Sequence, residues 1–426
     1  MRILLVSHGL PPDSVGGVEQ HVSGLAAALV AQGHEVDIFA RGNLPGAPQG
    51  SFEQTVDSNP RVWRTAYRWE NVDSLDAMYL CTPMADAMER FLAERQGEGV
   101  RYDVAHIHHL TGMSVESLQR LRDAGVPIVM TLHDYWLLSP CGQLFYQEGP
   151  LDQRVQPDQT KACLTRLFPG WMQKDPDATV ARLHERTRTT LALPKRLIVP
   201  SARAIPAFEG IGVARDRFTV VENGVDTDSL KKLPAPSGGP GPLRIGYFGT
   251  LMPSKGLDVL IAAVQALPPG MVELHIHGNT VPYHGDETYL TKCFMQLQPG
   301  SGVTYYGPYS LEEMPDRMAT IDVLAAPALW HEVFGLTVRE ALAAARPVLV
   351  SQIGGLQDAI EDGMQGRILP PGDVNSWAAA IRELAEDRAL LQRFIANSRV
   401  RARGFDAMAH DLSIIYSEAA EGPGRS

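Results

Sequence analysis

The sequence lacks the long apolar run that a membrane-spanning helix requires. No stretch of its 426 residues approaches the roughly 20 apolar residues needed to cross a bilayer. The apolar run at 3–6 is too short for a signal peptide, and no small-residue cleavage site follows it. We therefore expect a cytoplasmic protein. A loose basic segment leaves peripheral contact with the inner face of the membrane open: Arg182, Arg186, Arg188, Lys195 and Arg196.

Cysteine and positive charge are also scarce. The four cysteines, Cys81, Cys141, Cys163 and Cys293, form no C-x-x-C pair, which argues against a compact zinc knuckle and fits a reducing compartment. The net charge of −11 argues against a nucleic-acid-binding protein, which needs a basic face. Apolar residues make up 44% of the chain, which is ordinary for a globular protein, and the length suits two domains.

Short apolar runs alternate with helical patterns, which predicts parallel sheets covered by helices. The expected strands of the first half are 2–7, 35–40, 104–108, 128–132, 196–200 and 218–221, with a helix at 18–32. A Pro/Gly-rich segment at 231–242 has no apolar periodicity and predicts a linker. The expected strands after it are 243–248, 272–277, 303–306, 323–326 and 347–350, with a helix at 256–266.

This pattern predicts two doubly wound α/β domains, at 1–230 and 243–404, facing each other across a cleft. Ligands of such sheets bind beyond the carboxyl ends of the strands. The C-terminal segment 405–426 is helical in pattern, and we expect it to pack back on the N-terminal domain.

The most specific motif contains two glutamates eight positions apart, Glu332 and Glu340, around a Phe-Gly turn. A helix is expected to begin near Leu336, and its N-terminus would offer N–H groups to a phosphate or to sugar hydroxyls. A carboxylate one turn into that helix suits the two hydroxyls of a ribose, and one on the preceding loop suits a hexose. Taken alone, the pattern fits two ordinary surface glutamates equally well.

A glycine-rich turn, GTLMPSKG at 249–256, follows the first strand of the second half and places Lys255 at the mouth of the sheet. Such a turn suits a diphosphate. It is not a Walker A loop, because the glycine before the lysine and the Ser/Thr after it are missing. The segments NGVD at 223–226 and IGGL at 353–356 are further turns.

In this order, the motifs resemble those of the GT-B-fold retaining glycosyltransferases of family 4. The match runs from the first strand to about residue 370. In the first half its segments are GGVE at 16–19, TLHDYW at 131–136 and NGVD at 223–226. In the second half they are 249–256, Asp322-Val323 with Pro327 and Trp330, 331–340 and 345–355. The resemblance implies two Rossmann-like domains and transfer of a hexose from a UDP-, GDP- or ADP-sugar to a carbohydrate, lipid-linked or small-molecule acceptor. It also implies retention at the anomeric carbon, no bound metal and no permanent cofactor.

The resemblance further implies residue roles. Lys255 would neutralise the leaving diphosphate, Glu332 would bind the donor sugar, and His133 would hydrogen-bond that sugar near the reacting face. Glu340 would bind the ribose hydroxyls. The other candidate donor-binding residues are Phe334, Gly335, Leu336, Gly249, Thr250, Gly16, Gly17 and Arg339.

Two positions depart from the family pattern. Thr250 stands where the family usually has arginine, so one cation is missing; Arg339 and Arg346 are the candidates to replace it. Ala345 precedes Arg346-Pro347 where the family commonly has glycine before proline, which changes a turn. Two other functions stay open: a sugar-nucleotide epimerase or phosphorylase on the same fold, and an inactive nucleotide-sugar-binding partner subunit.

Two further features are open to interpretation. His106, His108 and Asp134 form an alternative metal site, which alternation along the strand and the resemblance both disfavour. The insertion at 139–175 is interpreted as an acceptor-side loop, and its two cysteines are too few for a tetrahedral thiolate site.

Overall fold

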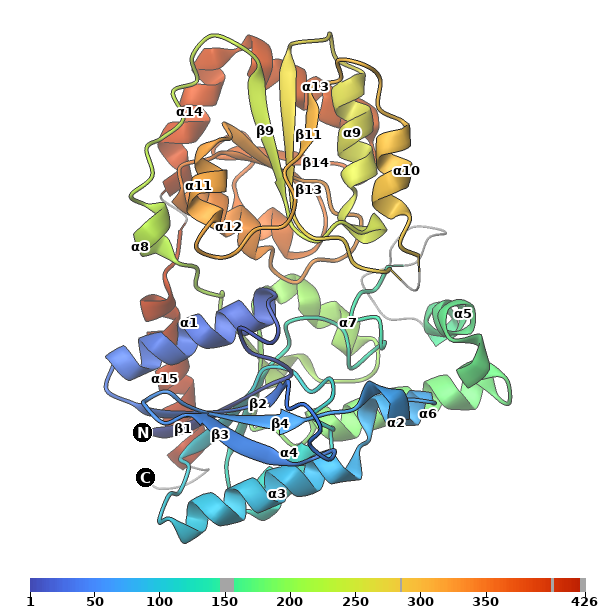
Figure 1. The fold of residues 1–426 in the computed structure, drawn as a ribbon, viewed down its shortest axis with the longest axis vertical. Helices are drawn as coiled ribbons and strands as arrows, with labels where there is room; N and C mark the ends of the chain where they lie inside the picture. Colours follow the sequence, from blue (N-terminus) through green and yellow to red (C-terminus); the bar gives the residue numbers. More distant parts are fainter. Residues whose placement is uncertain (146–156, 284–285, 400–401, 422–426) are drawn as a thin grey trace. The chain divides into compact units, whose positions relative to one another are not determined.

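The computed structural model describes residues 1–145, 157–283, 286–399 and 402–421. The chain divides into two compact units, each described below by itself. Unit 1 comprises Met1–Gly224 with Phe405–Ser426, and unit 2 comprises Val225–Gly404 (Figure 1). The Pro/Gly-rich segment 231–242 lies within unit 2. None of the described helices combines the length and apolarity that a bilayer crossing demands.

Unit 1 is built on an eight-stranded sheet in the order β3-β4-β2-β1-β5-β6-β7-β8, parallel except for the β3–β4 pair. Its strands are β1 (Arg2–Ser7), β2 (Glu35–Gly42), β3 (Phe52–Val56), β4 (Arg61–Ala66), β5 (Val104–Ile107), β6 (Ile128–Thr131), β7 (Arg196–Val199) and β8 (Phe218–Val220). Its helices are α1 (Gly17–Ala31), α2 (Leu75–Tyr79), α3 (Thr82–Gly97), α4 (Ser117–Asp123), α5 (Pro157–Leu167), α6 (Pro176–Leu191), α7 (Ile205–Glu209) and α15 (Phe405–Glu421).

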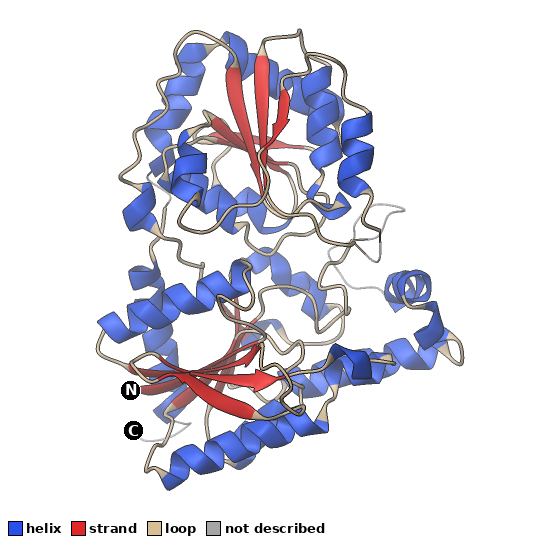
Figure 2. Ribbon diagram, in the orientation of Figure 1, coloured by secondary structure: helices blue, strands red, loops and turns tan. Residues whose placement is uncertain are grey.

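Unit 2 is built on a six-stranded parallel sheet in the order β11-β10-β9-β12-β13-β14. Its strands are β9 (Leu243–Phe248), β10 (Val272–His277), β11 (Val303–Tyr305), β12 (Val323–Ala326), β13 (Val348–Ser351) and β14 (Gly366–Leu369). Its helices are α8 (Thr227–Leu230), α9 (Leu257–Gln265), α10 (Tyr289–Met295), α11 (Met314–Ala319), α12 (Leu336–Ala343), α13 (Val374–Glu386) and α14 (Arg388–Ser398). Figure 2 shows the strands of each unit enclosed by its helices.

The predicted doubly wound α/β architecture is confirmed in both units. Most of the strands that the sequence predicts are nearly continuous apolar runs that the structure buries: all four residues of β5, β6 and β13 are buried, whereas the edge strands β8 and β11 are not. Such runs require cover on both faces of a sheet. The sequence analysis did not predict β3, β4 and β14. Four of the five residues of β3 are exposed, so this edge strand carries no apolar signal.

The C-terminal helix α15 belongs to unit 1, where it lies alongside α1 (Figure 1). Met408, Leu412 and Tyr416 are buried in the same apolar core as the strands and α1. The Tyr416 hydroxyl lies 2.6 Å from Nδ1 of His106 on β5, so the last helix is tied to the centre of the sheet.

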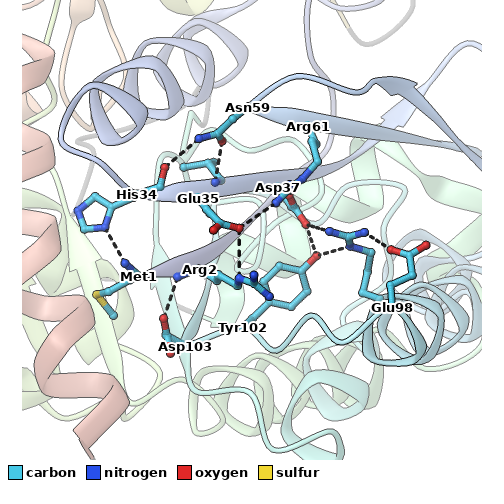
Figure 3. Close-up of polar contacts among 12 residues, drawn as sticks. Met1, Arg2, His34, Glu35, Asp37, Asn59, Arg61, Glu98, Tyr102 and Asp103 are labelled. Atoms are coloured by element: carbon cyan, nitrogen blue, oxygen red, sulfur yellow. Dashed lines mark hydrogen bonds and ion pairs between the residues drawn. The ribbon is translucent and has the colours of Figure 1, made fainter.

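A buried ionic network lies at the amino edge of the unit 1 sheet (Figure 3). Asp37 on β2 is 1% exposed and accepts three hydrogen bonds. Arg61 Nε donates to Oδ1 at 2.6 Å, while Arg95 Nη2 and the Tyr102 hydroxyl donate to Oδ2 at 2.9 and 2.6 Å. Arg95 also pairs with Glu98. One carboxylate therefore joins β2, β4, α3 and the segment before β5.

Helix α12 ends in a Schellman turn that places alanine in a left-handed conformation. The Arg346 N–H donates to the Ala341 carbonyl at 2.8 Å, the Ala345 N–H donates to the Leu342 carbonyl at 3.0 Å, and Ala345 has φ 62°. Left-handed backbone costs a non-glycine residue about 1–2 kcal/mol. The departure from glycine at this turn is therefore a source of backbone strain.

We expect Ala345→Gly to stabilise the protein by up to about 1 kcal/mol, because relief of this strain exceeds the entropy that glycine gains in the unfolded chain. The midpoint of thermal unfolding of unit 2 should rise by about 1–4 °C. The matched control is Ala344→Gly, since Ala344 has an ordinary φ of −79°. That change should lower the midpoint, and a fall for both variants would contradict the prediction.

Candidate functional site

The strand order of unit 2 reverses between β9 and β12, and open α/β sheets bind ligands at such a point. The loop after β9 carries Lys255 and the loop after β12 carries Glu332. The two side chains meet: Lys255 Nζ donates to Glu332 Oε1 at 2.6 Å. The structure thus brings together two of the three candidate catalytic residues, which are 77 positions apart.

The ion pair lines a pocket beyond the carboxyl ends of these strands. The residues around it are Tyr247, Phe248, Leu324, Ala325, Ala326, Pro327, Ala328, Gly335, Thr337, Val338 and Leu356. Lys255 Nζ also lies 5.3 Å from the ring centroid of Trp330. Of the described residues that line this pocket, Lys255 is the only cation and Glu332 the only anion.

Close backbone approach explains the glycines around this pair. Gly256 has φ 69°, and a Cβ there would lie 2.1 Å from the Pro327 carbonyl oxygen. Gly354 has φ 52°, and a Cβ there would lie 2.3 Å from the Glu332 carbonyl oxygen. The Gly355 N–H donates to that same oxygen at 2.6 Å. The IGGL turn therefore fixes the loop that carries Glu332.

The N-terminus of helix α12 points at the loop that carries Glu332. Its N-cap is Gly335 with φ 80°, and no side chain among the described residues caps it. The first N–H groups of a helix have no intrahelical partner and carry a partial positive charge. The N–H groups of Gly335 and Leu336 are thus suited to an anionic or hydroxyl ligand, while the Phe334 side chain is buried.

Glu340 lies one turn into α12. Burial, with a smaller contribution from the charge of Asp226, raises its pKa to about 7. Asp226 caps α8 by accepting from the N–H groups of Asp228 and Ser229, and α8 contacts α12. The NGVD segment was predicted as a turn and as part of the family resemblance, but nothing in its spacing reveals a carboxylate beside Glu340.

The arginines considered as replacements for the missing cation are both held by carbonyl groups. Arg339 is 5% exposed; it donates to the Phe334 carbonyl and, at 3.0 Å, to the Gly355 carbonyl. Arg346 donates to the Pro234 carbonyl at 2.9 Å and precedes β13, at the amino edge of the sheet. Thr250 follows β9, and its carbonyl accepts from the Tyr247 hydroxyl at 3.1 Å. Arg346 therefore lies at the opposite edge from the pocket, and Arg339 braces the loops around it.

In unit 1, the predicted residues lie at the carboxyl edge of the sheet. Gly16 and Gly17 begin α1 directly after the loop that follows β1. His133 follows β6, and its Nε2 is 3.1 Å from Nδ1 of His108. Burial lowers the pKa of His133 well below its usual value, with a smaller contribution from His21, so the imidazole is neutral. It is suited to hydrogen-bond a hydroxyl group.

The alternative metal set of His106, His108 and Asp134 is not the one that the structure assembles. His106 is hydrogen-bonded to Tyr416 and, at 2.7 Å, to Thr131. Asp134 instead lies 3.1 Å from His109 and accepts from the Trp136 N–H.

The predicted insertion at 139–175 is described in part, because 146–156 lie outside the described residues. The rest contains α5, whose Cys163 hydrogen-bonds Cys141 through the thiols. In the basic segment nearby, Arg186 and Arg188 pair with Asp76 and Glu185.

Comparisons with known proteins agree with this geometry. A family model described as Glycosyltransferase Family 4 matches residues 15–229, and one described as Glycosyl transferases group 1 matches residues 233–401. Glycogen synthase of Mycobacterium tuberculosis is 29% identical, over 94% of this chain and 90% of its own. Phosphatidyl-myo-inositol mannosyltransferase of Mycobacterium leprae is 26% identical, over 96% and 94%. The structure of Anabaena HepE in complex with UDP-glucose matches with a TM-score of 0.68 at 18% identity, over 98% and 100%, which is a likeness of fold.

Proposed function

The chain belongs to glycosyltransferase family 4, and from this premise we propose that it moves a hexose from a nucleotide-sugar donor to an acceptor with retention at the anomeric carbon. The observation that carries the proposal is the Lys255–Glu332 pair at the switch point of unit 2, beside the N-terminus of α12. An ammonium group and helix N–H groups stabilise a leaving diphosphate, and a carboxylate on the same loop accepts hydrogen bonds from a sugar.

The groups at this site support the retaining mechanism that the resemblance implies. Glu332 is the only carboxylate among the described residues of the pocket, and its pairing with Lys255 disfavours it as a covalent nucleophile. We propose that the acceptor hydroxyl attacks the face from which the diphosphate departs. The diphosphate, held by Lys255 and α12, takes the acceptor proton as the new glycosidic bond forms. Gly16, Gly17 and His133 of unit 1, and the donor contacts of Phe334, Gly249, Thr250 and Arg339, stay predictions.

The relatives support the donor class and differ in acceptor. HepE is described with UDP-glucose, and the two mycobacterial relatives are named for glycogen and phosphatidyl-myo-inositol. We therefore propose a carbohydrate or lipid-linked acceptor, in polysaccharide, glycolipid or glycoconjugate synthesis. The relatives are named as synthase and transferase, which does not favour an epimerase or phosphorylase. Lys255 in the pocket disfavours an inactive partner subunit despite Thr250.

A thermal-shift screen against UDP-, GDP-, ADP- and dTDP-sugars tests the donor site. We expect one nucleotide to raise the unfolding midpoint of the wild type. Glu340→Gln should weaken the binding of that nucleotide about 10- to 100-fold, because charged hydrogen bonds contribute about 1.5–3 kcal/mol. Glu386→Gln, an exposed change at the end of α13, is the matched control and should bind normally. Absence of a shift with every nucleotide would overturn the proposal.

The same variant gives a pH test. The pKa of Glu340 is raised to about 7 in the folded protein, so its carboxyl group takes up a proton as the pH falls through that value. Only the ionised carboxylate accepts hydrogen bonds from both ribose hydroxyls through two oxygens. Nucleotide affinity of the wild type should therefore fall between pH 8 and about pH 6, and Glu340→Gln should show weak binding that does not change over this range.

A further inference from the structure

Three imidazoles meet at the carboxyl edge of the unit 1 sheet. His108 follows β5, His133 follows β6, and His21 comes from the second turn of α1. The order of this sheet reverses between β1 and β5, so the cluster lies at the switch point of unit 1. Within the described part of the chain, these are the three side chains whose ligand atoms all lie within 4.8 Å of one another.

Their separations suit one small cation. His108 Nδ1 and His133 Nε2 are 3.1 Å apart. Two nitrogens on one tetrahedral zinc ion, each about 2.0–2.1 Å from the metal, are separated by about 3.4 Å. The ring centroid of His21 lies 4.6 Å from that of His133 and 5.1 Å from that of His108. Small side-chain rotations would place three nitrogens around one point.

Hydrogen bonding among the described residues pairs His108 Nδ1 with His133 Nε2, but it leaves other nitrogens of the cluster without a partner. His21 is 2% exposed, and neither of its ring nitrogens has a hydrogen-bond partner among the described residues. Nε2 of His108 is also buried without one. Buried polar groups are normally paired, since an unpaired one loses its hydration without compensation. The adjacent His106 meets this rule, because both of its nitrogens are bonded.

We propose that His21, His108 and His133 form a binding site for one divalent transition-metal cation, with Zn²⁺ the best match. Three neutral nitrogen ligands favour Zn²⁺, Co²⁺, Ni²⁺ or Cu²⁺, whereas Mg²⁺ and Ca²⁺ require oxygen ligands. A three-histidine set leaves a fourth position for water or an exogenous ligand. The cation gives a nitrogen of His21 a partner and replaces the hydrogen bond between His108 Nδ1 and His133 Nε2.

Cobalt binding to the full-length protein tests the site. Protein stripped with a chelator and then freed of it is titrated with Co²⁺, and the visible absorption of a tetrahedral centre should saturate at one ion per chain. Zn²⁺ should displace the Co²⁺ and abolish the band. His21→Gln and His108→Gln should each weaken Zn²⁺ binding at least about 100-fold in calorimetry, since each removes a direct ligand.

His410→Gln is the matched control, because His410 is an exposed histidine on α15 and should leave the titration unchanged. The far-ultraviolet circular dichroism and the nucleotide-induced thermal shift of each variant establish that it is folded. Absence of the cobalt band in the wild type, or an undiminished band in folded His21→Gln, overturns the proposal.

A consequence for turnover rests on the proposed function. A metal bound to His133 competes with the hydrogen bond to the donor sugar that the resemblance assigns to this residue. Zn²⁺ should therefore raise the donor KM of the wild type, and His21→Gln should lose this inhibition. Inhibition that persists in His21→Gln would show that Zn²⁺ acts elsewhere, whereas failure of all nucleotide binding would concern the donor site in unit 2.

Discussion

Lys255→Met should lower the turnover of the nucleotide-sugar donor about 100- to 1,000-fold, the range found when a positioned group that stabilises developing negative charge is removed. Methionine keeps most of the apolar stem of the side chain and removes the ammonium group, which lies 5.3 Å from the ring centroid of Trp330. Thr250 supplies no second cation, and Arg339 and Arg346 are held by backbone carbonyls. We therefore expect none of these three residues to compensate for the lost charge of Lys255.

Equilibrium binding measurements distinguish the loss of diphosphate stabilisation by Lys255 from general damage to the pocket. Lys255→Met should weaken the nucleoside diphosphate about 10- to 100-fold and leave the nucleoside monophosphate nearly unchanged, if the ammonium group contacts the outer phosphate. Glu340→Gln should weaken both, because both contain the ribose. Lys292→Met is the control, since Lys292 is a 63% exposed lysine of the same unit that pairs with Asp286. Equal weakening of monophosphate and diphosphate by Lys255→Met would refute the assigned role.

The sequence predicted most of the parallel strands, because burial on both faces requires continuous apolar runs. The sequence did not predict β4, where a charged residue is buried because ion pairs and hydrogen bonds satisfy it. Arg64 on β4 is 8% exposed, which an arginine permits because it donates to Asp13 at 2.8 Å and to the Pro11 carbonyl at 2.8 Å. Asp13 and Pro11 lie on a loop distant in the sequence, so no apolar pattern in the strand indicates that Arg64 is buried.

The sequence predicted those parts of the site whose motifs directly follow the ends of predicted strands. The order of the motifs places Lys255 and Glu332 after neighbouring strands of a doubly wound sheet, whereas their direct ion pair depends on loop geometry that spacing does not determine. Asp226 approaches Glu340 only because α8 contacts α12. His21 lies in a helix whose pattern gives no reason to bury a histidine, so the three-histidine cluster had no sequence signal.

The second large effect concerns stability at the opposite edge of unit 1. Asp37→Ala should destabilise the protein by about 3–5 kcal/mol, because it removes the buried carboxylate that pairs with both Arg61 and Arg95. Arg61 retains Glu35 at 3.5 Å and is partly in solvent, but Arg95 is 8% exposed and retains the largely exposed Glu98, the Tyr102 hydroxyl at 3.3 Å and the face of Trp63, 4.6 Å away. For a unit of this size the unfolding midpoint should fall by about 6–20 °C in calorimetry.

A second substitution, at Arg95, should restore part of the lost stability. If the cost comes from the uncompensated Arg95 guanidinium, then Asp37→Ala with Arg95→Met should recover much of the lost stability, as happens when a whole buried ion pair is replaced by apolar groups. Glu98→Ala is the control and should cost less than about 1 kcal/mol, since Glu98 is 60% exposed. Nucleotide binding should survive in every variant below its unfolding temperature, because the network lies at the amino edge of unit 1 and the donor pocket lies in unit 2. A double variant no more stable than Asp37→Ala would place the cost in the lost Tyr102 and Arg61 hydrogen bonds instead of in the stranded charge.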